Sequence, residues 1–443
     1  MKKKLTAEQR TLINQLLDRG QDREAIALQA SVTPGQVSAI AAHRTIQKRR
    51  FPADAFLPAF QHKRIGDQLS ANEILLGYAK GHSVFWNPHS TVNPHILIVG
   101  ESGFGKTYTT SCLIAELAHR DVPTVVFDYG QGFTPESADP VFRQEVSPMQ
   151  LEVGRKGVAI SPFEIFEADA HGPLSVAQRV ADTLIRVYQN LGIQQHATIR
   201  QAVLDVLEDA GIHAKVSATW RKPLPRFGLV HKKLAEYTQD LTNSDRKTAR
   251  SAASHVSSLF LFDIFRASGV SMQWAELLKR GHQCTIVQLR GLEQNLQRAT
   301  TEFLLWNLLA YLESLGPQAL HCFVVIDEAH RIPTGNGSAV ERLLREGRKF
   351  GVGIILASQQ PEDFTSIAYS NTATKLIFQI TDDKLTVTKQ LFKKMKTPMS
   401  FQELHRVVTT LDRGCAFALT HNNGDVIRVA SLAERFSPHL EAR

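Results

Sequence analysis

The stretch Gly100–Thr107 reads G-E-S-G-F-G-K-T, in which glycines precede a lysine and a hydroxyl residue. It follows the apolar run His95–Val99, which is typical of a buried parallel strand, and it precedes a helical pattern over Tyr108–His119. In this arrangement backbone amides and the helix N-terminus bind phosphate oxygens, because their partial positive charges converge on the loop. Lys106 supplies a mobile charge for the β- and γ-phosphates, and the Thr107 hydroxyl can ligate Mg²⁺.

The sequence therefore predicts a binding site for ATP and Mg²⁺. The residues expected to contact the nucleotide are Gly100, Glu101, Ser102, Gly103, Phe104, Gly105, Lys106, Thr107 and Tyr108.

An acidic pair, Asp327-Glu328, follows a second apolar run, Phe323–Ile326. The run predicts a buried strand that places Asp327 at its carboxyl end, within reach of the Mg²⁺ shell. Glu328 can orient and polarise the attacking water. Phosphoryl transfer needs little covalent help, so fixed charge and a positioned water account for most of the catalysis.

Three further candidates lie at predicted strand ends or beside them. Gln359, with Gln360 as the open alternative, follows the run Val352–Ala357 and is placed to sense a γ-phosphate. Asp128 ends the run Thr124–Phe127, where it either borders the nucleotide cleft or serves as a structural turn carboxylate. Arg345 and Arg348 are candidates to reach a γ-phosphate, most plausibly that of the next subunit, with ordinary ion pairing as the alternative.

The N-terminal region is basic and helical in pattern. The net charge is +8, and residues 1–70 hold twelve basic and six acidic residues, so most of the excess lies there. Three short helices are expected over residues 5–45, an arrangement similar to a helix-turn-helix unit that either contacts DNA or docks to a protein. The residues expected to contact nucleic acid are Gln36, Ser38, His43, Lys48, Arg49 and Arg50.

The remaining sequence sets the expected organisation. Residues 1–48 are interpreted as the helix-turn-helix domain, 49–73 as a linker and 74–443 as one α/β domain with a helical insertion at about 165–283.

Hydrophobic residues make up 43% and charged residues 21%, which excludes a disordered or fibrous chain. No apolar run approaches the roughly 18 residues that span a bilayer. The four cysteines form no C-x-x-C pair, so reduced core thiols of a cytoplasmic protein are expected.

Taken together, these motifs resemble those of the HerA/FtsK group of P-loop ATPases, and of HerA-like ATPases in particular, over about residues 74–435. The resemblance rests on Gly100–Thr107, on Phe323–Arg331 with its V-V-I-D-E-A-H-R, on R-E-G-R-K-F-G at Arg345–Gly351 and on A-S-Q-Q-P at Ala357–Pro361. It implies a RecA-like core in a ring, a homo-hexamer, with an arginine supplied by a neighbouring subunit. It also implies Lys106 and Thr107 as phosphate and Mg²⁺ ligands, Asp327 and Glu328 as the acidic pair, and Gln359 as the sensor.

The sequence departs from this family pattern in two places. The stretch that separates the helix-turn-helix region from the phosphate loop is too short for the small β-barrel that HerA relatives usually carry there. Gly132 stands where such proteins often have an acidic residue after the second strand.

The expected function is an ATP-driven translocase or helicase of double-stranded DNA. The resemblance to HerA-like ATPases implies a partner nuclease or effector in DNA repair or antiviral defence, and the sequence itself shows no nuclease motif. One alternative is an ATP-dependent scaffold or regulator of an associated enzyme, with the helix-turn-helix as its docking module. Another is a motor of conjugation or secretion, which the missing membrane segment disfavours.

Overall fold

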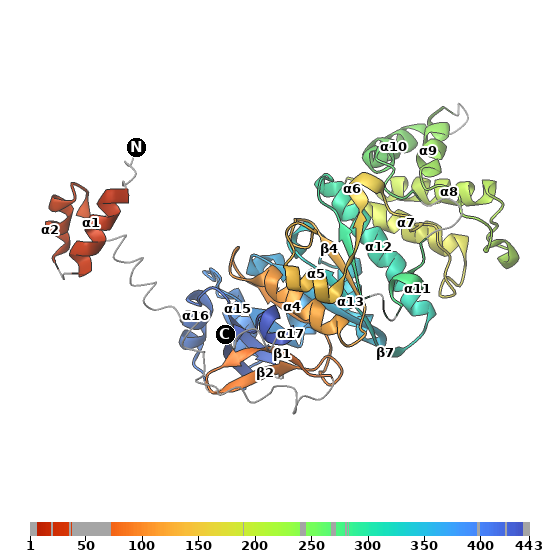
Figure 1. The fold of residues 1–443 in the computed structure, drawn as a ribbon. Coiled ribbons are helices and arrows are strands. Elements are labelled where there is room, and N and C mark those ends of the chain that lie inside the picture. The colour runs from red at the N-terminus through yellow and green to blue at the C-terminus, as the bar shows by residue number, and fades with distance from the viewer. Residues whose placement is uncertain are drawn as a thin grey trace.

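The computed structural model describes residues 7–18, 21–34, 37, 72–188, 190–239, 245–266, 272–279, 281, 283–396, 399–420 and 423–436. The helices, labelled as in Figure 1, are α1 Ala7–Asp18, α2 Arg23–Gln29, α4 Lys106–Ala118, α5 Pro140–Val146, α6 Val153–Lys156, α7 Pro173–Val187, α8 Ile193–Asp209, α9 Leu229–Gln239, α10 Arg246–Leu261, α11 Trp274–Leu277, α12 Gln294–Ser314, α13 Ala339–Glu346, α14 Ser366–Asn371, α15 Thr386–Phe392, α16 Phe401–Thr409 and α17 Leu432–Phe436. The strands are β1 Ile74–Ala79, β2 His82–Trp86, β3 Ile96–Val99, β4 Thr124–Asp128, β5 Met149–Glu152, β6 Cys284–Gln288, β7 Gln318–Ile326, β8 Phe350–Ser358, β9 Thr374–Ile377, β10 Cys415–Thr420 and β11 Asn423–Val429.

These strands form one mixed sheet in the order β2-β1-β11-β10-β9-β3-β8-β7-β4-β6-β5. The part from β9 to β5 is parallel, and the part from β2 to β9 is antiparallel. Because β3, β7 and β8 are parallel neighbours in the centre, the loops after them emerge at the same edge of the sheet. The predicted α/β fold class is confirmed.

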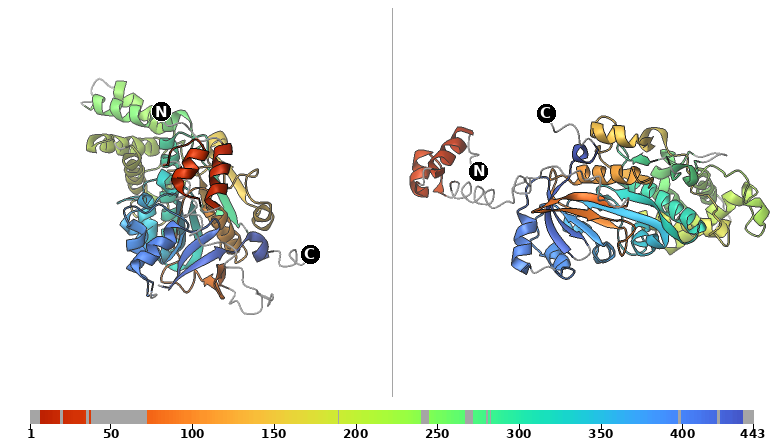
Figure 2. Two further views of the ribbon diagram at one scale, coloured as in Figure 1. Left: turned by 90° about the vertical axis from the view of Figure 1, so that its left-hand side faces the viewer. Right: turned by 60° about the horizontal axis from the view of Figure 1, so that its bottom comes forward.

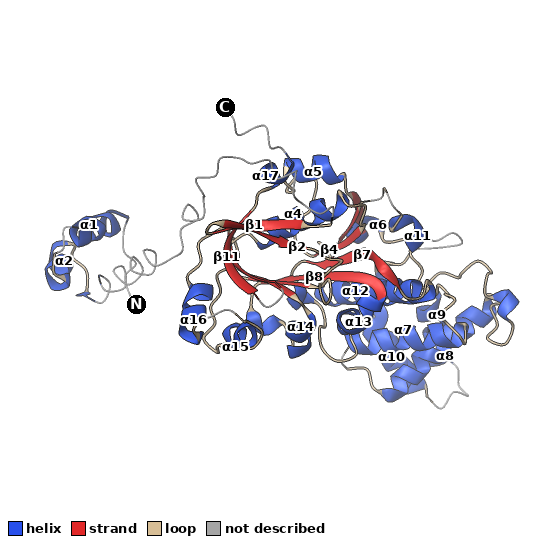
Figure 3. Cartoon of the chain, turned by 90° about the horizontal axis from the view of Figure 1, so that it is seen from below, coloured by secondary structure: helices blue, strands red, loops and turns tan. Residues whose placement is uncertain are grey.

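Helices cover both faces of the sheet, α4, α5 and α17 on one and α12, α13 and α14 on the other (Figure 3). Side chains along the central strands alternate between the two apolar cores that result. On β3, for example, Ile96 and Ile98 pack beneath α4, whereas Leu97 and Val99 face the core that contains α12. The two-sided burial explains why the central strands are continuous apolar runs.

The helices α8, α9 and α10 project from one end of this body, far from α15 and α16 at the other end (Figures 1 and 2). They belong to the region 165–283, which the sequence predicts to be helical. Here the apolar positions lie on one side of each helix, as at Ile199, Val203 and Val206 of α8, and pack into the large core. The helix α9 was not expected from the sequence, where its lysines obscure the apolar pattern.

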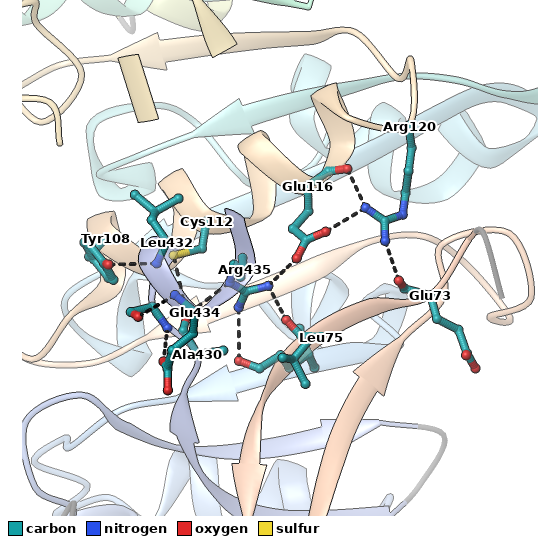
Figure 4. A network of polar contacts seen from close by, with 12 residues as sticks. Glu73, Leu75, Tyr108, Cys112, Glu116, Arg120, Ala430, Leu432, Glu434 and Arg435 are labelled. Carbon is teal, nitrogen blue, oxygen red and sulfur yellow. Dashed lines mark hydrogen bonds and ion pairs between the residues drawn. The ribbon is translucent and has the colours of Figure 1, made fainter. Parts of the chain in front are cut away.

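A network of buried arginines joins α4 to the sheet edge and to the C-terminal helix (Figure 4). Arg435, whose side chain is 1% exposed, donates to the carbonyls of Leu76 and Ala430 at 3.3 and 3.1 Å and to that of Leu75. It also pairs with the Glu116 carboxylate of α4 at 2.9 Å. Each donor group of the guanidinium has an acceptor, which offsets the cost of burying the charge.

The same Glu116 carboxylate holds a second arginine (Figure 4). Arg120 pairs with it at 2.6 Å and donates to the Glu73 carbonyl just before β1. Near the other end of α4, the Tyr108 hydroxyl accepts from the Leu432 amide at 2.9 Å. The helix that follows the phosphate loop is therefore fixed along its length to β1 and α17.

The N-terminal helices α1 and α2 lie within the predicted helix-turn-helix region. They share a separate small core of Ile13, Leu16, Ile26, Ala27, Ala30 and Val37. The Asp22 side chain caps α2 by accepting from the Glu24 amide at 3.0 Å. The predicted third helix lies mostly outside the described residues, as do Gln36, Ser38, His43, Lys48, Arg49 and Arg50. The helix-turn-helix and its nucleic-acid contacts stay a prediction.

The sequence also predicts a hairpin turn across Asn422-Asn423-Gly424 and helices over 338–350 and 300–315, and these boundaries are wrong. The hairpin turn, expected at Asn422-Asn423-Gly424, falls earlier, because Asn423 already pairs with Thr420 and Gly424 with Leu419. The buried strand β10 also pairs with β9, and this register overrides the Asn-Gly turn signal. The helix expected over 338–350 ends at Glu346, since a 3-10 turn at Gly347–Lys349 returns the chain to β8. Helix α12 begins at Gln294 rather than Thr300, and the partly exposed strand β5 was not expected.

All four cysteines are buried and reduced, as expected. No helix of the described part of the chain combines the length and apolar character that crossing a membrane requires.

Candidate active site

The glycine-rich loop connects β3 to α4 at the carboxyl edge of the sheet. The amides of Gly100 and Glu101 donate to the carbonyls of Ser358 at 3.3 Å and Gln379 at 2.8 Å, which anchors the loop to the segments after β8 and β9. Gly105 has φ 114°, a conformation that side chains disfavour. Among the described residues, the amides of Gly103, Gly105 and Lys106 have no hydrogen-bond partner. These amides stand at the N-terminus of α4, where an anion is favoured.

The Lys106 side chain lies beneath this loop and is 6% exposed. Its Nζ donates to the Glu101 carbonyl at 3.1 Å. Burial lowers the lysine pKa, and the nearby carboxylates of Glu328 and Asp327 oppose that shift. Lys106 and the acidic pair therefore lie close together at the carboxyl edge of the sheet.

The Thr107 hydroxyl contacts Asp327 directly. Its Oγ1 donates to Asp327 Oδ2 at 3.0 Å, while Asp327 Oδ1 is buried without a partner among the described residues. Burial and, next, the neighbouring Glu328 carboxylate raise the pKa of Asp327 to about 7. A hydroxyl and a carboxylate with a spare buried oxygen form the oxygen-rich environment that Mg²⁺ prefers, so these two side chains fit the predicted ion.

The Glu328 carboxylate lies at the same edge and is held by Gln359. Gln359 Nε2 donates to both Glu328 oxygens at 3.1 Å. The backbone at Glu328 has φ 64°, a left-handed conformation that is uncommon for a residue with a side chain and is often found at functional sites. Gln360, the open alternative, is exposed, and its amide donates to Asp363. The geometry favours Gln359 as the residue that acts with Glu328.

Asp128 is 1% exposed and acts as a turn carboxylate. Its oxygens accept from the amides of Gly130 and Phe133 at 2.9 and 3.1 Å, and from Gln288 Nε2 at 3.0 Å. The structure therefore gives it the structural role that the sequence left open, although its charge contributes to the raised pKa of Asp327.

The turn that Asp128 holds presses Gly132 against the site. A Cβ at Gly132 would lie 2.5 Å from Thr107 Cγ2 and 3.7 Å from Asp327 Oδ2. The departure noted at Gly132 thus has a steric reason, because an acidic side chain would displace the threonine that contacts Asp327.

The candidate arginines lie at the opposite edge of the sheet. Arg348 precedes β8, whereas Gln359 follows its far end, and the eight steps of ~3.3 Å between the end residues of this nine-residue strand separate them by roughly 26 Å or more. An arginine of this segment therefore cannot reach a phosphate in its own subunit's loop. Arg345 pairs with Glu341 at 2.7 Å. Arg348 is exposed and makes no ion pair with any residue that the structure describes.

Three residues that the sequence did not single out as site residues lie beside Glu328 at the carboxyl edge of the sheet. They are His330, Ser358 and Asp363. His330 Nδ1 is 3.2 Å from Glu328 Oε2 and 3.3 Å from Ser358 Oγ. The Ser358 hydroxyl donates to Asp363 Oδ2 at 2.5 Å. His330 could have been predicted from its position two residues after Glu328. Ser358 and Asp363 have no such position relative to a predicted site residue from which their role could have been inferred.

Comparison with known proteins places these motifs in a family context. Residues 75–308 match the model of a family described as "Helicase HerA, central domain". The DNA double-strand break repair helicase HerA of Saccharolobus solfataricus is 25% identical over 65% of the chain, and a probable helicase of Methanocaldococcus jannaschii is 22% identical over 77%. The chain spans 54% and 62% of the length of these two curated relatives.

Solved structures support the fold. VirB4 of Thermoanaerobacter pseudethanolicus superposes with a TM-score of 0.64 at 14% identity, covering 82% of this chain and 97% of that one. The plasmid coupling protein TrwB in complex with ADP and Mg²⁺ gives 0.53 at 14% identity, covering 76% and 85%. The predicted RecA-like core is confirmed at the level of fold.

Gly132→Ala tests the contact between the turn and Thr107. We expect the affinity for an ATP analogue with Mg²⁺ to fall about tenfold, equivalent to ~1.4 kcal/mol, because the new methyl group displaces the threonine. Gly130→Ala is the matched control, since its Cβ would meet nothing nearer than Asp128 Oδ1 at 3.8 Å. Titration with a fluorescent nucleotide measures both; equal affinities would contradict the steric argument.

Asp327→Asn tests the burial of the acidic charge in protein free of nucleotide and metal. The folded-state pKa is raised to about 7 from 3.8, so the folded protein binds more protons between these values and the aspartate costs stability as the pH rises. The variant should therefore be more stable than the parent at pH 8, by about 2 kcal/mol more than at pH 5. Urea unfolding at both pH values measures this, with the exposed Asp121→Asn as control. A gain that is the same at both values would refute it.

Proposed function

The chain belongs to the HerA helicase central-domain family, and on that premise we propose that it hydrolyses ATP to move along double-stranded DNA. The observation that carries the proposal is the single cleft in which Thr107 contacts Asp327 while Gln359 holds Glu328. Glu328 and Gln359 lie beyond the matched range 75–308, so they support the assignment independently of the match.

Each side chain of the cleft has a distinct role in this proposal. The loop amides and Lys106 bind the phosphates, and Thr107 and Asp327 hold Mg²⁺, which when bound neutralises charge on the phosphates. Glu328 accepts a hydrogen bond from the attacking water and orients it in line with the γ-phosphorus. Gln359, which donates to Glu328, links the state of the γ-phosphate to the position of that carboxylate. TrwB, with the same fold, binds ADP and Mg²⁺, which supports this choice of ligands.

The arginine placement supports a ring, for which we propose a homo-hexamer. A finger roughly 26 Å from its own site is useful only if a neighbour's nucleotide lies beside it. Arg348 is the better candidate, because Arg345 is already paired with Glu341.

Duplex DNA is the proposed track, with a nuclease or effector as partner. Support comes from the basic excess in residues 1–70 and from the relative whose name describes a double-strand break repair helicase. A role in DNA repair or antiviral defence belongs to the same proposal.

The proposal predicts ATP hydrolysis that duplex DNA stimulates. Glu328→Gln should bind ATP but hydrolyse it at least about a hundredfold more slowly, because the amide cannot accept the proton of the water. Lys106→Ala should lose binding as well, whereas the exposed Glu403→Gln should match the parent. Phosphate release with and without DNA measures the rates. Hydrolysis that no DNA changes would refute the motor, and a fully active Lys106→Ala would refute the site.

Arg348→Ala tests whether the arginine acts between subunits. Alone, it should bind ATP normally and hydrolyse it slowly. Mixed with Lys106→Ala subunits, it should recover activity above the sum of the two, because some junctions then pair an intact nucleotide site with an intact Arg348. A mixture of Lys106→Ala with the exposed variant Arg406→Ala is the reference, because it shows how inactive subunits affect the rate of subunits with an intact Arg348. No recovery on mixing would contradict a finger supplied in trans.

A further inference from the structure

A chain of polar contacts extends from Glu328 into the end of β8. His330 Nδ1 lies 3.2 Å from Glu328 Oε2 and 3.3 Å from Ser358 Oγ. The Ser358 hydroxyl lies 2.5 Å from Asp363 Oδ2. None of these three side chains has a role in the phosphate binding or metal binding described above.

Proton counting fixes the direction of these hydrogen bonds. The Ser358 hydroxyl has one proton, and Asp363 Oδ2 accepts it at a distance typical of a charge-assisted bond. An ionised Glu328 carboxylate has no proton to give. His330 Nδ1 is therefore the donor, and its single proton is shared between Ser358 Oγ, to which it makes a hydrogen bond, and Glu328 Oε2, which it approaches to 3.2 Å. The imidazole carries a proton on Nδ1, and the hydroxyl, fixed by Asp363, accepts from it.

The backbone around Ser358 ties this chain to the rest of the cleft. The Ser358 carbonyl accepts from the Gly100 amide at 3.3 Å, at the start of the phosphate loop. Asp363 Oδ2 also accepts from the Gln360 amide at 3.0 Å, next to Gln359. The residues that hold the His330 imidazole, Ser358 and Asp363, are therefore also hydrogen-bonded to the phosphate loop and to the segment next to Gln359.

The hydrogen bonds of Gln359 show why a second donor matters. Its Nε2 lies 3.1 Å from both oxygens of Glu328, a geometry in which one N–H is shared between the two oxygens and the other points elsewhere. A Gln359 side chain that turns toward a γ-phosphate moves this shared N–H away from Glu328. His330 is then the donor that keeps Glu328 in place, against the strain of a left-handed backbone at that residue.

We propose that His330, held by Ser358 and Asp363, is a positioning residue that fixes the Glu328 carboxylate while Gln359 engages the nucleotide. This inference rests on the proposed ATPase function. His330 acts through Glu328 and contributes to the rate of hydrolysis but not to nucleotide affinity.

A pair of substitutions at His330 tests the proposal in the full chain. His330→Ala should lower kcat about tenfold while leaving the affinity for an ATP analogue within about twofold of the parent, because orientation of the base affects only the chemical step. His330→Asn should recover most of the rate, since the asparagine amide can donate from nearly the position of Nδ1. Ser358→Ala should reproduce part of the loss.

His405→Ala is the matched control. His405 is 36% exposed against 35% for His330, and its Nδ1 contacts a threonine hydroxyl, that of Thr388, at 3.2 Å. It lies in α16 and contacts Thr388 and Asp382, neither of which belongs to the site, so the variant should hydrolyse ATP at the parental rate.

The outcomes separate this inference from the function on which it rests. If Glu328→Gln is inactive but His330→Ala matches or exceeds the parental rate, the inference is wrong and the ATPase assignment stands. If His330→Asn is as slow as His330→Ala, a donor at Nδ1 is not what matters, and the inference is again overturned. If the rate does not depend on Glu328 at all, both fail together.

Discussion

The hydrogen bond between Thr107 and Asp327 joins residues 220 positions apart, and the active-site geometry depends on it. It exists because β3 and β7 flank β8 in a parallel sheet, which brings the loops after them to one edge. The contact buries a carboxylate whose pKa rises to about 7 for lack of solvation and because Glu328 is adjacent. The folded protein thus holds Asp327 in an environment that favours the neutral carboxylic acid. A bound cation would lower the free-energy cost of the charged carboxylate there.

Much of the surrounding structure keeps this edge in register. Gly132 packs against Thr107 and leaves no room for a side chain, and Asp128 holds the turn that places it there. On the outer side of α4, Arg435 and Arg120 fix the helix through Glu116 to β1 and α17. The phosphate loop is therefore supported from the sheet beneath and from the helix behind, so little reorganisation is needed when charge develops at the site.

The length of β8 separates Arg348 from the site along one strand. Its carboxyl end carries Ser358 and leads into Gln359, and its amino end follows Arg348. His95 contacts the middle of β8: it is buried, accepts from the Ile354 amide, and has a pKa lowered to about 4 by burial. A neutral imidazole there ties β3 to β8 without adding charge.

The sequence by itself determined the fold class, the central strands and most of the cleft. Gly100–Thr107, Asp327 and Glu328 were identifiable because their patterns are local. A glycine-rich loop between a strand and a helix, and acids directly after an apolar run, can be recognised without knowing which strands are neighbours. The tertiary structure alone decided the structural role of Asp128, the steric reason for Gly132, the distance of Arg348 from its own cleft and the contacts among His330, Ser358 and Asp363. These depend on which strands become neighbours and on their register, and pairing over long sequence separations leaves no periodic trace in the chain.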